Sequence, residues 1–145
     1  MTDAGASAWL VWALLSALFA ALTAICAKLG VAGIDSDLAT FIRTLVVAGA
    51  LGTMLATLGK FQPVREITYR SWIFLILSGL ATGASWVCYF RALKLGDASR
   101  VAPIDKLSVV MVALIGVFLL GERLSALGWA GISLISVGAI LVAFS

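Results

Sequence analysis

The chain contains five apolar stretches that are each long enough to cross a lipid bilayer. A helix needs about 20 predominantly apolar residues to span roughly 30 Å of hydrocarbon. Lipid-exposed backbone must satisfy its own hydrogen bonds, and apolar runs of this length exclude membrane strands. The sequence therefore predicts an all-α integral membrane protein with one five-helix domain over residues 1–145. The approximate spans are 8–27, 38–59, 71–90, 101–121 and 124–144.

The composition excludes several other classes of protein. Of the 145 residues, 63% are hydrophobic and 12% are charged, whereas soluble domains average about 45–50% and about 25%. The net charge of +3 is scattered without a basic run, so we expect no nucleic acid partner. Histidine is absent, and Cys26 and Cys88 stand alone in apolar stretches, where we expect small core residues. We predict no metal, no cofactor, no catalytic residues and no enzymatic activity.

Three charged residues fall inside predicted spans. Arg43 lies early in the second span, and Asp105 and Lys106 lie at a similar depth in the fourth. A charge near the centre of a span costs about 2.5–3.5 kcal/mol on insertion scales, so a pair or triad lining a substrate cavity is expected. Asp105 and Lys106 are about 100° apart on a helix and should not face each other. Alternatively, the two cations extend to the head groups and Asp105 caps the fourth helix, with Pro103 in its first turn.

The embedded charges also indicate a class of substrate. Two cations and one carboxylate leave a net positive site, which favours a small anionic or zwitterionic molecule over an organic cation. Trp86 and Tyr89 lie toward the same end of the third span. They are expected either to line the cavity or to form part of an interfacial aromatic belt.

The charges outside the spans are balanced between the two sides of the membrane. Five spans place the termini on opposite sides, and each face then carries four basic residues. The counts are Lys60, Arg65, Arg70 and Arg123 against Lys28, Arg91, Lys94 and Arg100. The positive-inside rule then gives no clear orientation. The sequence predicts either dual insertion with antiparallel pairing or one orientation set by a weak bias.

Small residues on the fifth span suggest where two chains could meet. Gly131 and Gly138 are seven residues apart and fall on one stripe of that helix. Such stripes allow close backbone approach between membrane helices. We expect a dimer contact there, with packing inside one chain as the alternative.

Several segments carry a family resemblance. The whole chain resembles one EamA-type repeat of the drug/metabolite transporter superfamily, which is related to small multidrug resistance proteins. The resemblance is carried by Phe41–Arg43, Tyr89–Lys94, Ser99–Pro103, Leu119–Leu124 and the Gly131/Gly138 helix.

The sequence departs from the family pattern in two ways. The first span has no carboxylate, so the proton-coupled cation mechanism of small multidrug resistance proteins does not transfer. Most EamA-type carriers hold two inverted repeats in one chain, whereas this chain holds one.

The resemblance implies a multi-pass carrier of the plasma (inner) membrane. It would move a small polar metabolite by alternating access as an antiparallel homodimer, with substrate contacts at Arg43, Lys106, Asp105, Trp86 and Tyr89. Two alternatives are a flippase for a lipid-linked sugar or phosphate and an accessory subunit without transport.

Overall fold

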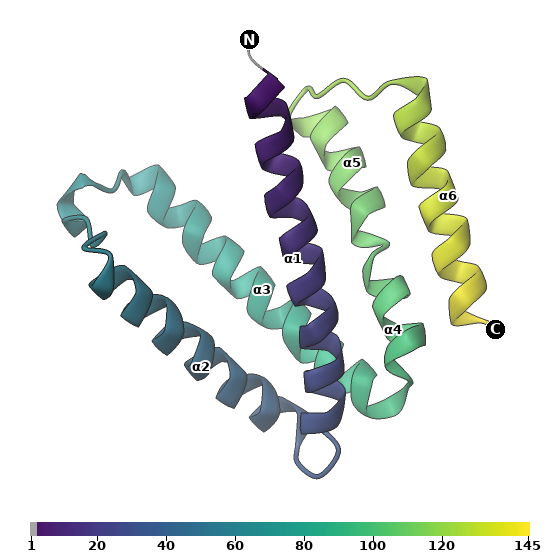
Figure 1. Ribbon diagram of the computed structural model, residues 1–145, viewed down its shortest axis with the longest axis horizontal. Coiled ribbons are helices and arrows are strands. Elements are labelled where there is room, and N and C mark those ends of the chain that lie inside the picture. Colours follow the sequence, from purple (N-terminus) through teal and green to yellow (C-terminus); the bar gives the residue numbers. More distant parts are fainter. Residues whose placement is uncertain (1–2) are drawn as a thin grey trace. The chain divides into compact units, whose positions relative to one another are not determined.

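A computed structural model describes residues 3–145, and this part of the chain is helical without strands. The all-α prediction is confirmed, and five helical segments are long and apolar enough to cross a membrane. Figure 1 shows their arrangement along the chain. The helices are α1 (Asp3–Gly30), α2 (Ser36–Thr57), the short 3₁₀ helix η1 (Val64–Glu66), α3 (Tyr69–Leu95), α4 (Ala98–Asp105), α5 (Ser108–Leu119) and α6 (Ala126–Ala143).

The chain divides into two compact units. Unit 1 combines Met1–Lys28 with Leu95–Ser145, and unit 2 is the continuous segment Leu29–Lys94. Unit 1 therefore holds α1, α4, α5 and α6, and unit 2 holds α2, η1 and nearly all of α3.

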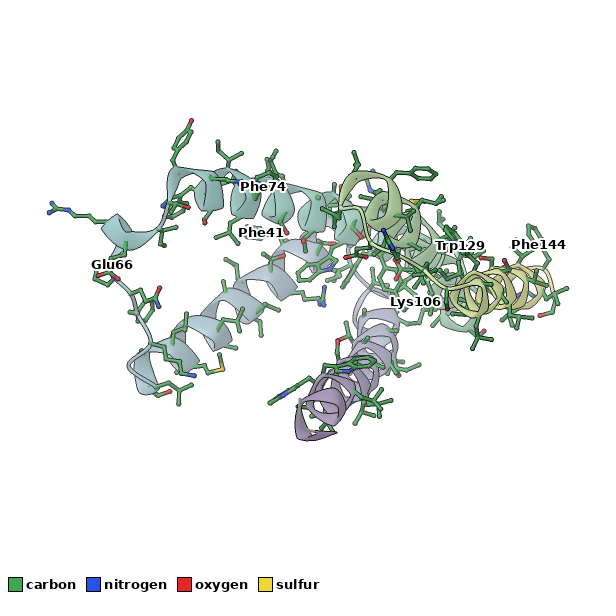
Figure 2. The ribbon with its side chains drawn as sticks, turned by 90° about the horizontal axis from the view of Figure 1, so that it is seen from above. Phe41, Glu66, Phe74, Lys106, Trp129 and Phe144 are labelled. Carbon is green, nitrogen blue, oxygen red and sulfur yellow. The ribbon has the colours of Figure 1, made fainter. Side chains whose placement is uncertain are left out.

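Unit 2 is a helical hairpin whose two helices converge at one end. Asp35 caps α2, and its carboxylate accepts from the backbone N–H groups of Asp37 and Leu38. Figure 2 shows α2 and α3 close together at this end and apart toward η1, where Glu66 lies. The buried residues of unit 2 come from the same convergent end: Val31, Ser36, Ala39, Thr40, Phe90 and Leu93.

In unit 1, α4 and α5 both pack against α6. The connection between α5 and α6 turns at Gly121, whose φ of 70° is accessible to glycine at little cost. The Gly116 carbonyl accepts from the backbone N–H groups of Leu120 and Glu122 at 3.2 and 3.0 Å. The Ser125 hydroxyl then caps α6 by accepting from Gly128 N–H at 3.1 Å. Local hydrogen bonds therefore hold both ends of the turn between the last two spans.

The fourth span is interrupted, which corrects two expectations. Helix α4 begins at Ala98, so Pro103 lies inside the helix and not in its first turn. A proline there lacks the N–H that would continue the ladder and crowds the preceding turn. The helix ends at Asp105, and α5 starts at Ser108 after two turn residues. Asp105 therefore terminates a helix and does not cap one.

The two cysteines also differ from expectation. Both Cys26 on α1 and Cys88 on α3 are free and exposed, although we predicted core positions. The reason is physical: a membrane helix is apolar on all sides, so apolar neighbours in the sequence do not identify the side that packs against protein.

Candidate functional site

Arg43 forms the core of an aromatic cluster in unit 2. Its guanidinium carbon lies 3.8 Å from the centre of the Trp86 ring and 5.7 Å from the centre of the Phe90 ring. Arg43 and Trp86 are half-buried and Phe90 is buried. Contacts of this length are within the range of cation–π attraction, which strengthens where water is excluded. Arg43 is thus directed toward α3 and not along its own helix to the head groups.

Tyr89 belongs to the same region of α3. It is half-buried and interacts electrostatically with Arg43. Trp86, Tyr89 and Phe90 lie within five residues of one another, so they share just over one helical turn. The structure therefore brings Arg43, Trp86 and Tyr89 together, three of the five residues predicted to bind substrate. Phe90 was not among the predicted site residues.

The convergent end of unit 2 is closed by polar contacts outside this cluster. Arg91 donates to both carboxylate oxygens of Asp37, with its Nε 2.8 Å from Oδ1. Lys94 Nζ donates to the Ile34 carbonyl at 2.9 Å. These contacts occupy the two cations in the C-terminal part of α3. Within Leu29–Lys94, Asp37 pairs with Arg91, and Arg43 has no carboxylate within ion-pair distance.

The Asp37–Arg91 pair was not predicted, because Asp37 was considered only as a cap of the second span and Arg91 only as a charge on one membrane face. A usable signal was present in the sequence. Asp37 starts the second span and Arg91 ends the third, so successive spans place them on the same membrane face at equal depth. Opposite charges at matched depth on neighbouring helices predict an ion pair, and this arrangement could have been identified without coordinates.

Asp105 and Lys106 form a pair of their own in unit 1. Lys106 Nζ lies 3.2 Å from Asp105 Oδ2, and their side chains are 57% and 36% exposed, respectively. The expectation that these neighbours do not face each other is wrong. It assumed a regular helix, whereas α4 ends at Asp105 and Lys106 already lies in the turn before α5. Outside the helical ladder, the long lysine side chain can fold back to the adjacent carboxylate.

The backbone changes its hydrogen-bond pattern at this pair. Lys106 N–H approaches both the Ala102 and Pro103 carbonyls, at 3.3 and 3.1 Å, and Leu107 N–H donates to Ile104 at 3.0 Å. Bonds to the third preceding residue are typical of a tightened 3₁₀ turn, which often marks a functional hinge inside a helix. The predicted site residues thus fall into two groups: the Arg43 cluster in unit 2 and the Asp105–Lys106 pair in unit 1.

The predicted dimer stripe lies on α6. A Cβ added at Gly131 or Gly138 would meet nothing within 4 Å. No other helix of unit 1 therefore packs closely against the backbone at these two glycines. Close packing inside one chain was the alternative to a dimer contact. Gly116 on α5 differs, because a Cβ there would lie 2.6 Å from Glu122 Oε2.

Comparison with known proteins gives consistent matches over nearly the whole chain. The EamA-like transporter family matches residues 7–144. A protein of a Sinorhizobium species, described as "Uncharacterized transporter in cobO 3'region", is 60% identical over 135 residues. The alignment covers 93% of this chain and 96% of that protein, so the two have nearly the same length. No solved structure matches.

Proposed function

Because the chain belongs to the EamA-like transporter family, we propose that it carries a small anionic or zwitterionic metabolite as an antiparallel homodimer working by alternating access. A multi-pass membrane transporter is the general class to which the family and the relative point. The proposal adds the substrate class, the dimer, and the plasma (inner) membrane as its location.

The observation that carries the proposal is Arg43 inside the second span. A permanent positive charge in a membrane segment is costly and is typically found facing a protein interior or a water-filled cavity. Arg43 contacts Trp86 at 3.8 Å and has no carboxylate partner in its own unit. A bound anion would supply the missing counter-charge, so substrate binding itself would stabilise the site.

The Asp105–Lys106 pair is proposed as the second element of the site. Interrupted membrane helices are a recurrent feature of substrate and ion sites in transporters, where unwound backbone lines a cavity. The break between α4 and α5 occurs at this pair. We propose that Lys106 contacts the substrate, and that Asp105 either pairs with one of the two cations or carries a coupling proton.

The dimer is proposed from the number of repeats and the charge balance. Alternating access is commonly built from two inverted halves around one central site, and this chain supplies five spans. Four basic residues on each face are compatible with insertion in both orientations. Gly131 and Gly138 are free of close packing within unit 1, so α6 could supply the contact between the two copies.

Flux in reconstituted liposomes tests this function. Vesicles holding only the purified chain are preloaded with a mixture of unlabelled amino acids and organic acids, and the exchange of single labelled compounds is followed. We expect saturable exchange of an anionic or zwitterionic compound that falls at least about tenfold in Arg43→Gln. Arg65→Gln is the matched control, because Arg65 is an exposed residue of η1.

Two outcomes would contradict the proposal. Absence of exchange for every compound would favour an accessory subunit without transport. Movement of labelled phospholipid, dependent on its head group and without exchange of water-soluble compounds, would favour the flippase.

A further inference from the structure

We propose that Arg43 recognises a single carboxylate, and that the transported substrate is an organic monocarboxylate. This inference rests on the proposed function and deepens it, because it names the chemical group that the same site binds. It starts from the charges within each unit and from the contacts of the Arg43 side chain.

The charge balance leaves one uncompensated cation among the embedded residues. Lys106 is 3.2 Å from the Asp105 carboxylate, so this pair is close to neutral as a group. In unit 2, Arg91 pairs with Asp37, and Lys94 donates to the Ile34 carbonyl. Arg43 therefore contributes one positive charge that no carboxylate of unit 2 balances. A ligand with one negative charge neutralises it.

The contacts of Arg43 suit a planar anion. The Trp86 ring centre is 3.8 Å from the guanidinium carbon, and the Phe90 ring centre is 5.7 Å from the same atom. An aromatic ring in contact with a guanidinium leaves the in-plane N–H donors available, because those donors point outward from the edge of the group. Two parallel N–H donors match the two oxygens of a carboxylate in both spacing and plane.

The single positive charge of Arg43 and its contact with Trp86 disfavour ligands that are doubly negative, positive or neutral. A phosphate monoester carries about −1.5 to −2 at neutral pH, which one guanidinium does not neutralise. An organic cation would be repelled by Arg43 and would compete with it for the Trp86 ring. A neutral amide would leave the positive charge uncompensated in a membrane segment, where it is costly.

Equilibrium binding with matched probes tests the inference. Radiolabelled benzoate and hexanoate, one aromatic and one aliphatic monocarboxylate, are bound to the full chain in lipid nanodiscs. Benzamide, benzylammonium and phenyl phosphate serve as competitors, because they share the benzoate ring and differ in charge. The variants are Arg43→Gln and Arg43→Lys, with Arg65→Gln as the control, and each is checked for helix content and for its elution volume.

We expect saturable binding of at least one carboxylate. Arg43→Gln should weaken this binding at least about tenfold. Arg43→Lys should weaken it less, because lysine keeps the charge but loses the paired donors. The three competitors should displace it at least about tenfold less well than unlabelled carboxylate. The inference is overturned if neither carboxylate binds, if phenyl phosphate or benzylammonium binds more tightly, or if Arg43→Gln binds as the wild type does.

The binding and flux results separate the two proposals. If the chain exchanges only phosphate esters in liposomes, the function as an anion carrier stands and the carboxylate assignment fails. If carboxylates bind through Arg43 but no compound is exchanged, the assignment stands and the transport function fails.

Discussion

Arg43 and Lys106 are both cations inside membrane spans, yet the protein accommodates them in different ways. Arg43 lies on a continuous helix in unit 2 and uses aromatic faces, with Trp86 at 3.8 Å. Lys106 lies at a helix break in unit 1 and pairs with the adjacent Asp105 at 3.2 Å. One charge is partnered by aromatic rings and remains uncompensated, and the other is neutralised by its sequence neighbour.

The difference follows from the local backbone. A regular helix directs neighbouring side chains apart by about 100°, so an embedded cation must find its partner on another helix. A break removes this restriction and lets residues i and i+1 approach. Proline at position 103 lies inside α4, three residues before the turn that begins at Lys106. Unit 2 therefore holds a cation that contacts aromatic rings, and unit 1 holds a cation that pairs with a carboxylate.

The largest expected effect tests whether Arg43 is the charge that binds substrate. Arg43→Ala removes the guanidinium and should reduce exchange at least about tenfold, since a hydrogen bond to a charged group contributes about 1.5–3 kcal/mol. Flux in liposomes is the measurement, and Arg65→Ala is the control. Retained flux in Arg43→Ala would show that unit 2 does not provide the binding charge.

The next effect concerns the pair in unit 1. Asp105→Asn leaves Lys106 as an unpaired charge in a span, which costs on the order of 2.5–3.5 kcal/mol near the centre and less near an end. We expect lower yield in the membrane and lower thermal stability in detergent. The double variant Asp105→Asn with Lys106→Met restores neutrality and should recover most of the stability. Equal loss in both variants would exclude charge pairing as the cause.

A smaller effect is expected when the aromatic partner of Arg43 is removed. Trp86→Leu takes away a cation–π contact of about 0.5–2 kcal/mol, which corresponds to a roughly two- to thirtyfold loss of substrate affinity. Competition binding measures this loss. Trp72→Leu is the matched control on the same helix, because Trp72 is exposed. An equal loss in both variants would mean that Trp86 has no special role.

The smallest effect belongs to the Asp37–Arg91 pair at the end of unit 2. Both side chains are about half exposed, and exposed ion pairs contribute little on average. Asp37→Asn should therefore change flux by less than about twofold. A loss as large as that of Arg43→Ala would place the pair within the transport machinery and would weaken the contrast between the two embedded cations.

The helical spans were predictable because the bilayer imposes their length and apolar character. The all-α class and the five spans follow from local sequence. Arg43 could also be singled out, because a charge in a span has few explanations. Its contact with Trp86 and Phe90 depends on how α2 and α3 approach each other, which hydropathy does not encode.

The break in the fourth span was only partly visible in the sequence. The charged residues marked the position where hydropathy falls, but a continuous helix was assumed. The helix start at Ala98 places Pro103 in the helix interior, and the helix end at Asp105 places Lys106 in a turn, where it pairs with its neighbour. Errors of a few residues at a helix boundary therefore decide whether two neighbours can pair.

The central claim is that two copies of one chain in opposite orientations form the carrier. The most direct test labels single cysteines in intact cells with a membrane-impermeant maleimide, in a background carrying Cys26→Ser and Cys88→Ser. One cysteine replaces Phe61 in the connection after α2, and the other replaces Gly33 in the connection before it. The account predicts that a similar fraction of each is labelled from outside. Labelling of one position alone would show a single orientation and contradict the account.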